Sequence, residues 1–271
     1  MLAEKAFFSF ASLTDPTRHR AYNAWHQLDH RPENLALDGV VYGERWVRSP
    51  DCAARGVAAQ GLADTHYVNM YWFAEPAEAS IAQWQQLAER SFQWGRRPDV
   101  AFTARPFMGF FSAIKGYASP RVLLSADALP FRPTRGVHIS LARLAAPHDR
   151  ATEALFSWYD QVRLPTLLTC PGVAGAWTFS SDSSTIDAAF TPDEESTTFR
   201  SSATAPGSLR MTVVFLDGDP LEFVDELDHL DATGEVPGSR RELETPLFAS
   251  ALRTIVPWEW DWFESDKGRV D

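Results

Sequence analysis

The chain has 271 residues, of which 45% are hydrophobic and 23% are charged, as is typical of a globular protein with one large core or two modest ones. Its formal net charge of -11 argues against nucleic acid and anionic membranes as partners, because Lys and Arg side chains bind both. Two cysteines, Cys52 and Cys170, can form neither a disulfide scaffold nor a four-cysteine zinc site. No apolar run approaches the ~20 residues of a membrane span, and we expect a cytoplasmic protein.

The first half of the chain predicts the element order β-α-β-β-α-β. Its first helix follows Asp15, a typical N-cap residue, and Pro16, a residue favoured at the first helical position. Pro32 predicts the point where this helix ends or turns. The expected strands cover residues 7–16, 40–48, 65–76 and 103–115, and the expected helices cover 15–32 and 81–94.

The second half repeats the first. WHQLDHRPENLALDGV (residues 25–40) aligns without a gap with WYDQVRLPTLLTCPGV (residues 158–173). The identical pairs are Trp25 and Trp158, Pro32 and Pro165, Leu35 and Leu168, Gly39 and Gly172, and Val40 and Val173. Strands at 137–149, 209–220 and 244–256 and a helix at 221–232 match the elements of the first half. A duplicated unit is the simplest explanation.

This repeat divides the chain into four parts. Residues 1–118 form the first unit, 119–133 a linker, 134–257 the second unit and 258–271 a tail that carries Trp258, Trp260 and Trp262. The Ser, Thr and Asp content of 179–208 predicts a mobile loop between two strands. The tail either packs on the fold or acts as a lid or dimer contact. Whether two chains form a homodimer stays open.

Each unit has the order of a ferredoxin-like fold, an antiparallel sheet with both helices on one face. The other face of each sheet would remain exposed, so we expect the two sheets to pack together as an intramolecular barrel. The predicted fold class is therefore α+β, with two ferredoxin-like repeats in one chain.

The helix that ends in W-[HY]-x-x-x-H-x-P, followed by a D/P-G-[VF] turn and a strand, resembles the dimeric α+β barrel superfamily and its EthD-like members in a tandem form. The resemblance covers most of residues 5–118 and 134–257. It implies a cavity between sheet and helices. It also implies one of several activities, because members include cofactor-independent cyclases, isomerases, dehydratases and monooxygenases as well as haem-binding branches.

The polar residues of the first helix form the candidate site. His26 and His30 are spaced i, i+4, and Tyr22 lies one turn earlier on the same face. The resemblance implies that His30 points into the cavity as a general acid or base, a role that suits an imidazole with a pKa near ~6.5. We expect His26 and Tyr71 to assist it. The alternative is that His30 caps the end of its helix.

The second half carries different ionisable residues at the same places. Tyr159 replaces His26, Val162 replaces Asp29 and Arg163 replaces His30. This difference predicts one active cavity, in the first half, with Arg163 either vestigial or an anion contact.

Further aromatic and polar side chains are candidates for substrate binding. Strand alternation places only one parity of each strand on a given face, so only some of them can line one pocket. The predicted substrate-binding set is Tyr22, Tyr42, His66, Trp72, Trp94 and Arg163.

A metal site is the main alternative for the two histidines. HxxxH can hold one ion, but the HExxH signature is lacking, and spacing specifies no third ligand among Asp29, Glu33, Glu44 and His66. We therefore predict no metal.

The predicted function is cofactor-independent proton transfer on a hydrophobic, aromatic or polyketide-like small molecule, by an isomerase, a cyclase or a dehydratase-type lyase. One alternative is haem binding through an axial histidine. The others are a cofactor-free monooxygenase and a non-catalytic ligand-binding protein.

Overall fold

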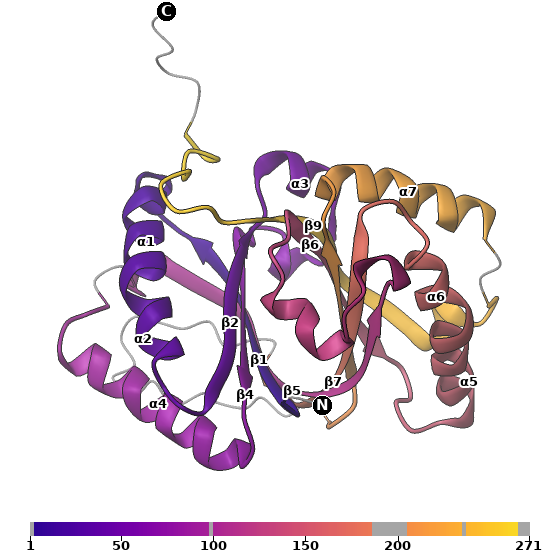
Figure 1. The fold of residues 1–271 in the computed structure, drawn as a ribbon, viewed down its shortest axis with the longest axis horizontal. Helices are drawn as coiled ribbons and strands as arrows, with labels where there is room; N and C mark the ends of the chain where they lie inside the picture. Colours follow the sequence, from indigo (N-terminus) through magenta and orange to yellow (C-terminus); the bar gives the residue numbers. More distant parts are fainter. Residues whose placement is uncertain (1–2, 98–99, 186–204, 235–236, 265–271) are drawn as a thin grey trace, which may run out of the picture.

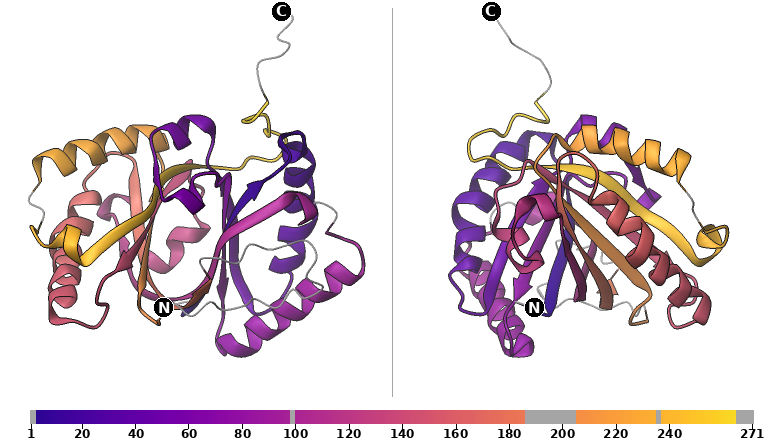
Figure 2. Two further views of the ribbon diagram at one scale, coloured as in Figure 1. Left: turned by 180° about the vertical axis from the view of Figure 1, so that it is seen from behind. Right: turned by 45° about the vertical axis from the view of Figure 1, so that its right-hand side comes forward.

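The computed structural model describes residues 3–97, 100–185, 205–234 and 237–264. Strands occupy the middle of the molecule, with α1, α2 and α4 on one flank and α5, α6 and α7 on the other (Figure 1). The view from behind shows the same arrangement, with the strands between two helical flanks (Figure 2). No helix within the described ranges is long and apolar enough to cross a bilayer.

The first half has the predicted order β-α-β-β-α-β, with short additions. Its elements are β1 (Lys5–Leu13), η1 (Pro16–Arg18), α1 (His19–Trp25), η2 (His26–His30), α2 (Arg31–Leu35), β2 (Val40–Val47), α3 (Pro50–Ala54), β3 (Val57–Ala58), η3 (Gln60–Leu62), β4 (Tyr67–Phe73), α4 (Ala77–Gln93), η4 (Val100–Phe102) and β5 (Thr103–Ala118).

The second half repeats this order after two short helices in the linker. Its elements are η5 (Pro120–Val122), η6 (Ala126–Phe131), β6 (Gly136–Leu144), α5 (Arg150–Trp158), η7 (Tyr159–Arg163), α6 (Leu164–Leu167), β7 (Val173–Thr185), β8 (Leu209–Leu216), α7 (Pro220–Thr233), α8 (Arg240–Leu243) and β9 (Glu244–Thr254). Strand β7 extends into the stretch expected to be a loop, and residues 186–204 of that stretch lie outside the described residues.

The expectation that the first helix ends at Pro32 is wrong, because the helix continues to Leu35 through a π-helical turn, η2. In that turn the Arg31 N–H donates to the carbonyl of His26, five residues back. A proline in an α-helix clashes with the carbonyl four residues before it, and the wider π turn relieves this clash. The second half has the same turn, η7, directly before α6 and its Pro165.

The strands form one closed barrel. Their order is β2-β4-β1-β5-β7-β8-β6-β9, and β2 pairs with β9, where Trp46 lies opposite Thr254. The long antiparallel pair β5 and β7 joins the two halves on the other side. Closure leaves β2 and β5, the outer strands of the first sheet, without free edges, as expected for two sheets packed in one chain.

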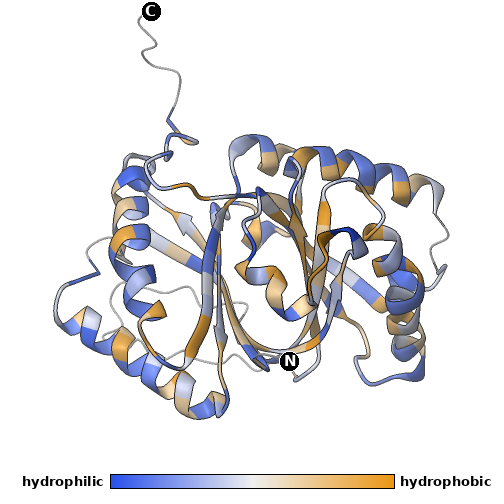
Figure 3. Ribbon diagram, viewed as in Figure 1, coloured by the Kyte–Doolittle hydropathy of each residue, from blue (hydrophilic) through white to orange (hydrophobic). Residues whose placement is uncertain are grey.

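One parity of the strands fills the barrel interior with apolar side chains. Phe8 contacts Phe179, and Phe10 contacts Phe248, so that rings of both halves interlock. Leu129 of the linker is fully buried against this core. In Figure 3 hydrophobic residues recur along the strands, whereas the outer helices carry many hydrophilic ones. The interior is a packed core, so a site must lie on the other face of the sheet.

The C-terminal tail packs over the first half, where it runs from β9 to the N-terminal end of α1 (Figure 1). Trp260 is buried in a cluster with Tyr22 and Tyr67, and the Phe263 ring stacks on His19 at 4.0 Å between centroids. Trp258 is largely exposed. The described part of the tail therefore packs on the fold, as one of the two sequence interpretations had it.

Candidate active site

A small cavity of about 30 Å³ lies in the first half, between the sheet and its helices. Strands β1, β4 and β5, the turn η2 and helix α4 with the segment after it supply its wall. The lining residues are Phe7, Ser9, His26, His30, Asn69, Tyr71, Trp84, Ala88, Arg97 and Arg105. Space of this size holds about two water-sized groups.

His30 lies on the cavity wall and not at a helix end, because the helix continues past it to Leu35. Its ring stacks on Trp25, with centroids 4.7 Å apart and an angle of 12° between the planes. The carboxamide nitrogen of Asn34 lies 3.3 Å from both ring nitrogens. Trp25, which we expected to serve only the packing of the fold, therefore also covers one face of the His30 ring.

Glu33 is the acidic partner of His30. Its Oε2 lies 3.8 Å from His30 Nδ1, and its Oε1 accepts hydrogen bonds from Ser91 and Arg96, each at 2.8 Å. Burial acts to raise the pKa of Glu33, but the hydrogen bonds with His30 and Ser91 and the Arg96 charge outweigh it and lower that pKa. Glu33 is thus a carboxylate at neutral pH. The sequence had suggested it only as a metal ligand.

Burial lowers the pKa of His30 to about 4, a shift that Arg97 and Arg105 increase and Glu33 opposes. His30 is therefore a neutral imidazole at pH 7, able to accept a proton. His26 lies beside it, with ring centroids 5.2 Å apart. Burial, aided by the Arg45 charge, lowers the pKa of His26 well below the ordinary value, so it is neutral too.

Tyr71 supplies a phenol to the same cavity from β4. Its hydroxyl lies 3.4 Å from the carboxamide nitrogen of Asn34, within reach of a weak hydrogen bond. Burial raises the pKa of Tyr71, so the phenol keeps its proton and can donate it in a hydrogen bond. The structure thus brings His26, His30 and Tyr71 together on one cavity wall.

Several polar atoms on this wall are buried without a hydrogen-bond partner among the described residues; they include Ser9 Oγ, His26 Nδ1, Asn69 Oδ1 and Arg97 Nε. Ser9 and Asn69 lie opposite each other on β1 and β4. Buried polar atoms are nearly always paired, and such a group of exceptions on one cavity indicates a place for a polar ligand.

Sequence reasoning missed Ser9, Arg97 and Arg105 as site residues. Ser9 lies two residues after Phe7 on β1, so both side chains point to the same face of the sheet. This alternation was the only feature of the sequence that could have indicated Ser9 as a site residue. Arg97 follows α4 and Arg105 lies near the start of β5, so only the fold brings them to the cavity.

Several predicted substrate-binding residues lie elsewhere. Tyr42 and Trp72 point into the barrel interior, the opposite face of the sheet. His66 accepts a hydrogen bond from the Leu13 N–H at 2.9 Å and packs against Phe263. These placements contradict the expectation that the three side chains line the pocket.

Trp94, Tyr22 and Arg163 also lie away from the cavity wall. Trp94 is 61% exposed just after α4. Tyr22 is buried behind His26, with ring centroids 6.0 Å apart. Arg163 is buried in the second half and pairs with Asp231 at 2.6 Å.

Arg45 lies behind the cavity, beside Tyr22 and Tyr67. The guanidinium is 0% exposed and lies over both rings, with distances of 5.0 and 4.6 Å to the ring centroids. It donates to the side-chain oxygen of Asn23, while its Nε and Nη1 have no partner. Burial lowers the pKa of Arg45, but it stays in the range of a cation at neutral pH.

In the described part of the second half, paired polar groups and apolar side chains occupy the equivalent region. Tyr159, at the place of His26, donates to Glu244 at 2.6 Å, and Glu244 also accepts from Arg240 at 2.5 Å. Arg210 lies over the Tyr159 ring at 4.7 Å. Val214 and Phe223 pack in an apolar cluster around the end of the helix. The polar groups here satisfy one another.

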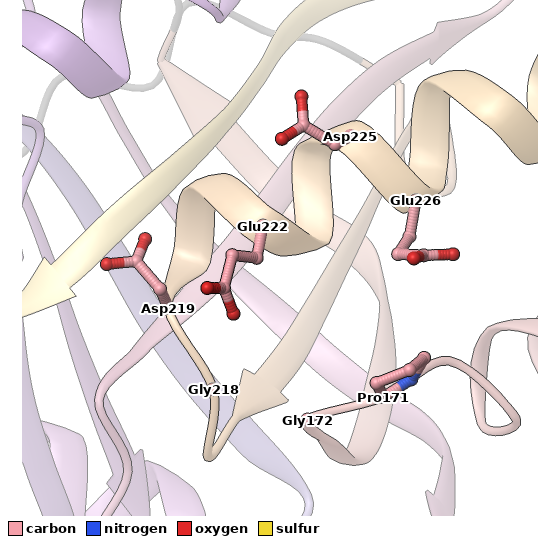
Figure 4. A pocket seen from close by; sticks show the side chains of 7 residues that line it. All are labelled: Pro171, Gly172, Gly218, Asp219, Glu222, Asp225 and Glu226. Atoms are coloured by element: carbon pink, nitrogen blue, oxygen red, sulfur yellow. The ribbon is translucent and has the colours of Figure 1, made fainter.

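A larger pocket of about 320 Å³ lies beside the start of α7 (Figure 4). Asp219 there caps α7 through the Leu221 N–H at 2.8 Å and pairs with Arg253 at 3.1 Å. Asp225 pairs with Arg55 at 2.6 Å and points away from the other carboxylates (Figure 4). These carboxylates serve the fold, and we assign no site to them.

The donor set and the size of the cavity decide whether these residues could hold a metal ion or haem. Within the described ranges, no group of three or more His, Cys, Asp or Glu side chains could hold a metal ion. Haem needs an axial ligand beside a pocket that encloses its ring, and pockets for drug-sized ligands already have about 300–1,000 Å³. The cavity at His26 and His30 has about 30 Å³, and the larger pocket has no histidine on its wall. These residues do not fit haem.

A scan against protein-family models finds no match for this chain, and neither does a search of curated proteins. Among solved structures, the chain is similar to an anthrone oxidase-like protein, with a TM-score of 0.55 and 10% identity over 94% of this chain and 92% of that one. The fold is that of the dimeric α+β barrels.

Two further structures agree with this fold. A monooxygenase-like protein from Fusobacterium nucleatum has a TM-score of 0.53 and 6% identity over 94% of both chains. A chlorite dismutase-like protein has a TM-score of 0.51 and 9% identity over 97% of this chain and 98% of that one. At such low identity the likeness concerns the fold alone.

Proposed function

We propose that this protein is a cofactor-independent enzyme of EthD-like tandem type, which moves a proton on a small carbonyl compound with an aromatic or polyketide-like body. The reaction is that of an isomerase, a cyclase or a dehydratase-type lyase. The observation that carries the proposal is the neutral His30 on the cavity wall, held by Trp25 and Asn34 and backed by the Glu33 carboxylate.

In the proposed step, His30 takes a proton from a carbon next to the substrate carbonyl. The C–H electron pair moves into the new C=C bond, and the carbonyl oxygen becomes an enolate. Glu33 stabilises the imidazolium that forms, as a carboxylate behind a catalytic histidine does. The Tyr71 hydroxyl, which keeps its proton, donates to the enolate oxygen. His30 then returns the proton to another carbon or to a leaving hydroxyl group.

The size of the cavity limits how the substrate binds. About 30 Å³ admits the reacting group of such a molecule and not its ring system. The wall residues Arg97 and Arg105 are only half-buried, so the remainder of the substrate would extend past them.

The test is hydrogen exchange of candidate substrates in D2O, followed by proton NMR, with 1,3-dicarbonyl compounds and anthrone as probes. Replacing His30 by Gln should slow the exchange roughly 10²- to 10⁴-fold, the usual contribution of one general base. His229→Gln, on the exposed side of α7, is the matched control and should exchange like the unmodified protein. Undiminished exchange in the His30 variant would contradict the proposal.

A second candidate is a cofactor-free monooxygenase, favoured by the monooxygenase-like and anthrone oxidase-like structures of the same fold. It shares the first step, after which O2 takes electrons from the enolate; an activated CH2 then becomes a carbonyl and the second oxygen atom leaves as water. Oxygen uptake with anthrone, measured with an electrode and lost in His30→Gln, would identify this branch. Binding of probes without exchange or oxygen uptake would instead indicate a ligand-binding protein.

A further inference from the structure

We infer that the ligand of the first-half cavity is a carboxylate, which Arg97 and Arg105 bind while the carbon that loses its proton lies at His30. This inference rests on the proposed function and adds the charge and class of the substrate.

Arg97 and Arg105 are the first support, because both line the cavity and neither forms an ion pair with a described residue. Across the described residues, no carboxylate lies within ion-pair distance of either one, although the chain has 36 acidic and 25 basic residues. Adjacent Arg96, by contrast, pairs with both Asp29 and Glu33. The charges of Glu33 and Glu89 act on Arg97 from beyond ion-pair distance, and Arg105 acts against it. Two neighbouring cations on one cavity wall therefore point to an anion from outside.

Arg45 is the second support. It is a fully buried cation behind His26 whose polar partner is the neutral oxygen of Asn23. An unpaired buried charge is strongly unfavourable, and a nearby anion compensates for it. Across the β2–β4 pair Arg45 lies opposite Asn69, which lines the cavity, so its charge acts on the ligand from behind the wall.

The unpartnered polar atoms are the third and independent support. Ser9 and Asn69 are 1% and 5% exposed, and each presents an unsatisfied polar atom. The Ser9 hydroxyl can rotate to donate, and the amide of Asn69 can turn its nitrogen inward. Both side chains lie on the same cavity wall as Arg97 and Arg105, so they can donate to a carboxylate there, and the Tyr71 hydroxyl remains available for the enolate oxygen.

Carboxylate binding would also change His30. The charged groups that face it are Arg97 and Arg105, which lower its pKa, and Glu33, which raises it; His26 and Tyr71 face it as neutral groups. An anion between the two arginines offsets their charge, so the pKa of His30 rises on binding and the residue becomes a stronger base. Substrate binding would thus activate the general base.

The experiment titrates the full-length protein with acetate, and with acetamide as a neutral probe of the same shape. Histidine ring signals in a proton–carbon NMR spectrum report binding and the pKa of His30. Acetate should bind in the millimolar range, acetamide at least roughly 10-fold more weakly, and acetate should raise the pKa of His30 by about 1 to 3. Chloride and phosphate, added at equal ionic strength, test whether any anion suffices.

Arg97→Gln and Arg105→Gln should each weaken acetate binding by about 10-fold or more, whereas Arg55→Gln, at an exposed position directly after α3, should not change it. The inference is overturned if acetate and acetamide bind alike, if neither binds, or if the arginine variants bind acetate normally. Equal binding of chloride and phosphate would overturn the carboxylate assignment.

The two proposals can fail separately. Acetate binding that persists in His30→Gln while this variant also keeps full proton exchange would refute the proposed function and leave carboxylate binding at Arg97 and Arg105 standing. If proton exchange depends on His30 but the protein does not bind acetate, the inference is refuted and the proposed function is not.

Discussion

The two halves share one fold but differ in whether their buried polar groups are satisfied. Each half has the same helix with a π turn, at His26–His30 and at Tyr159–Arg163. Between helix and sheet, the first half leaves a cavity with unpartnered polar atoms, whereas the second half closes the space with apolar side chains and a paired network around Glu244. Buried polar groups without partners are unfavourable for folding, so their retention in one half supports our proposal that the site lies there.

The largest stability difference should come from the paired network. Replacing Glu244 by Ala leaves Tyr159 and Arg240 without their acceptor, and should lower the free energy of unfolding by about 2 to 3 kcal/mol, since Arg240 is partly exposed. In the first half, Asn69→Leu removes an amide oxygen that has no partner, and should leave stability unchanged or increase it. Urea unfolding of both variants measures this difference in the free energy of unfolding. An equal loss of stability in Glu244→Ala and Asn69→Leu would contradict the prediction.

Acid should destabilise both halves through one histidine each. Burial lowers the pKa of His30 and of His138 to about 4, below the ~6.5 of an unfolded chain. Below pH ~6.5 these histidines bind protons in the unfolded chain but stay neutral in the folded protein. The free energy of unfolding therefore falls as the pH falls toward 4. Each histidine should account for about 2 kcal/mol between pH 7 and pH 5.

The variants His30→Gln and His138→Gln test this in urea unfolding at the two pH values. Each should lose less stability on acidification than the unmodified protein. Acetate should reduce the acid loss that depends on His30 and leave that of His138 as it is, because the arginine pair lies in the first half alone. An unchanged pH dependence in both variants would show that the folded protein does not lower the pKa of these two rings.

The smallest expected effect is a change in the free energy of unfolding that has opposite signs in Arg105→Gln and Arg210→Gln. Arg105→Gln removes one of two neighbouring cations from the cavity wall, and should raise the free energy of unfolding by about 0.5 to 1 kcal/mol. Arg210→Gln removes a guanidinium that packs over Phe156 and Tyr159, and should lower it by about 0.5 to 2 kcal/mol. Thermal unfolding without added ligand compares them, and a loss of stability in both variants would argue against an unpaired charge at Arg105.

Much of the fold could be predicted from the sequence, because the ungapped repeat of Trp, Pro, Leu, Gly and Val divides the chain into two units of one pattern. Strand alternation and the two helical stretches then give β-α-β-β-α-β twice. The helix boundary at Pro32 was wrong, since a π turn depends on hydrogen bonds that the sequence does not display. The spacing of His26 and His30 was enough to place both on one face.

Tertiary structure alone decided which other residues belong to the site. Tyr71 and Trp72 are neighbours on β4, and one faces the cavity while the other faces the barrel interior. Alternation could not separate them, because helices cover one face of this sheet and the second sheet covers the other, so both parities are buried. Arg97 and Arg105 reach His30 because β5 pairs with β1 and α4 packs beside them. The sequence by itself determined the duplicated units and the histidines of one helix; the cations around them depend on chain packing, which no local pattern encodes.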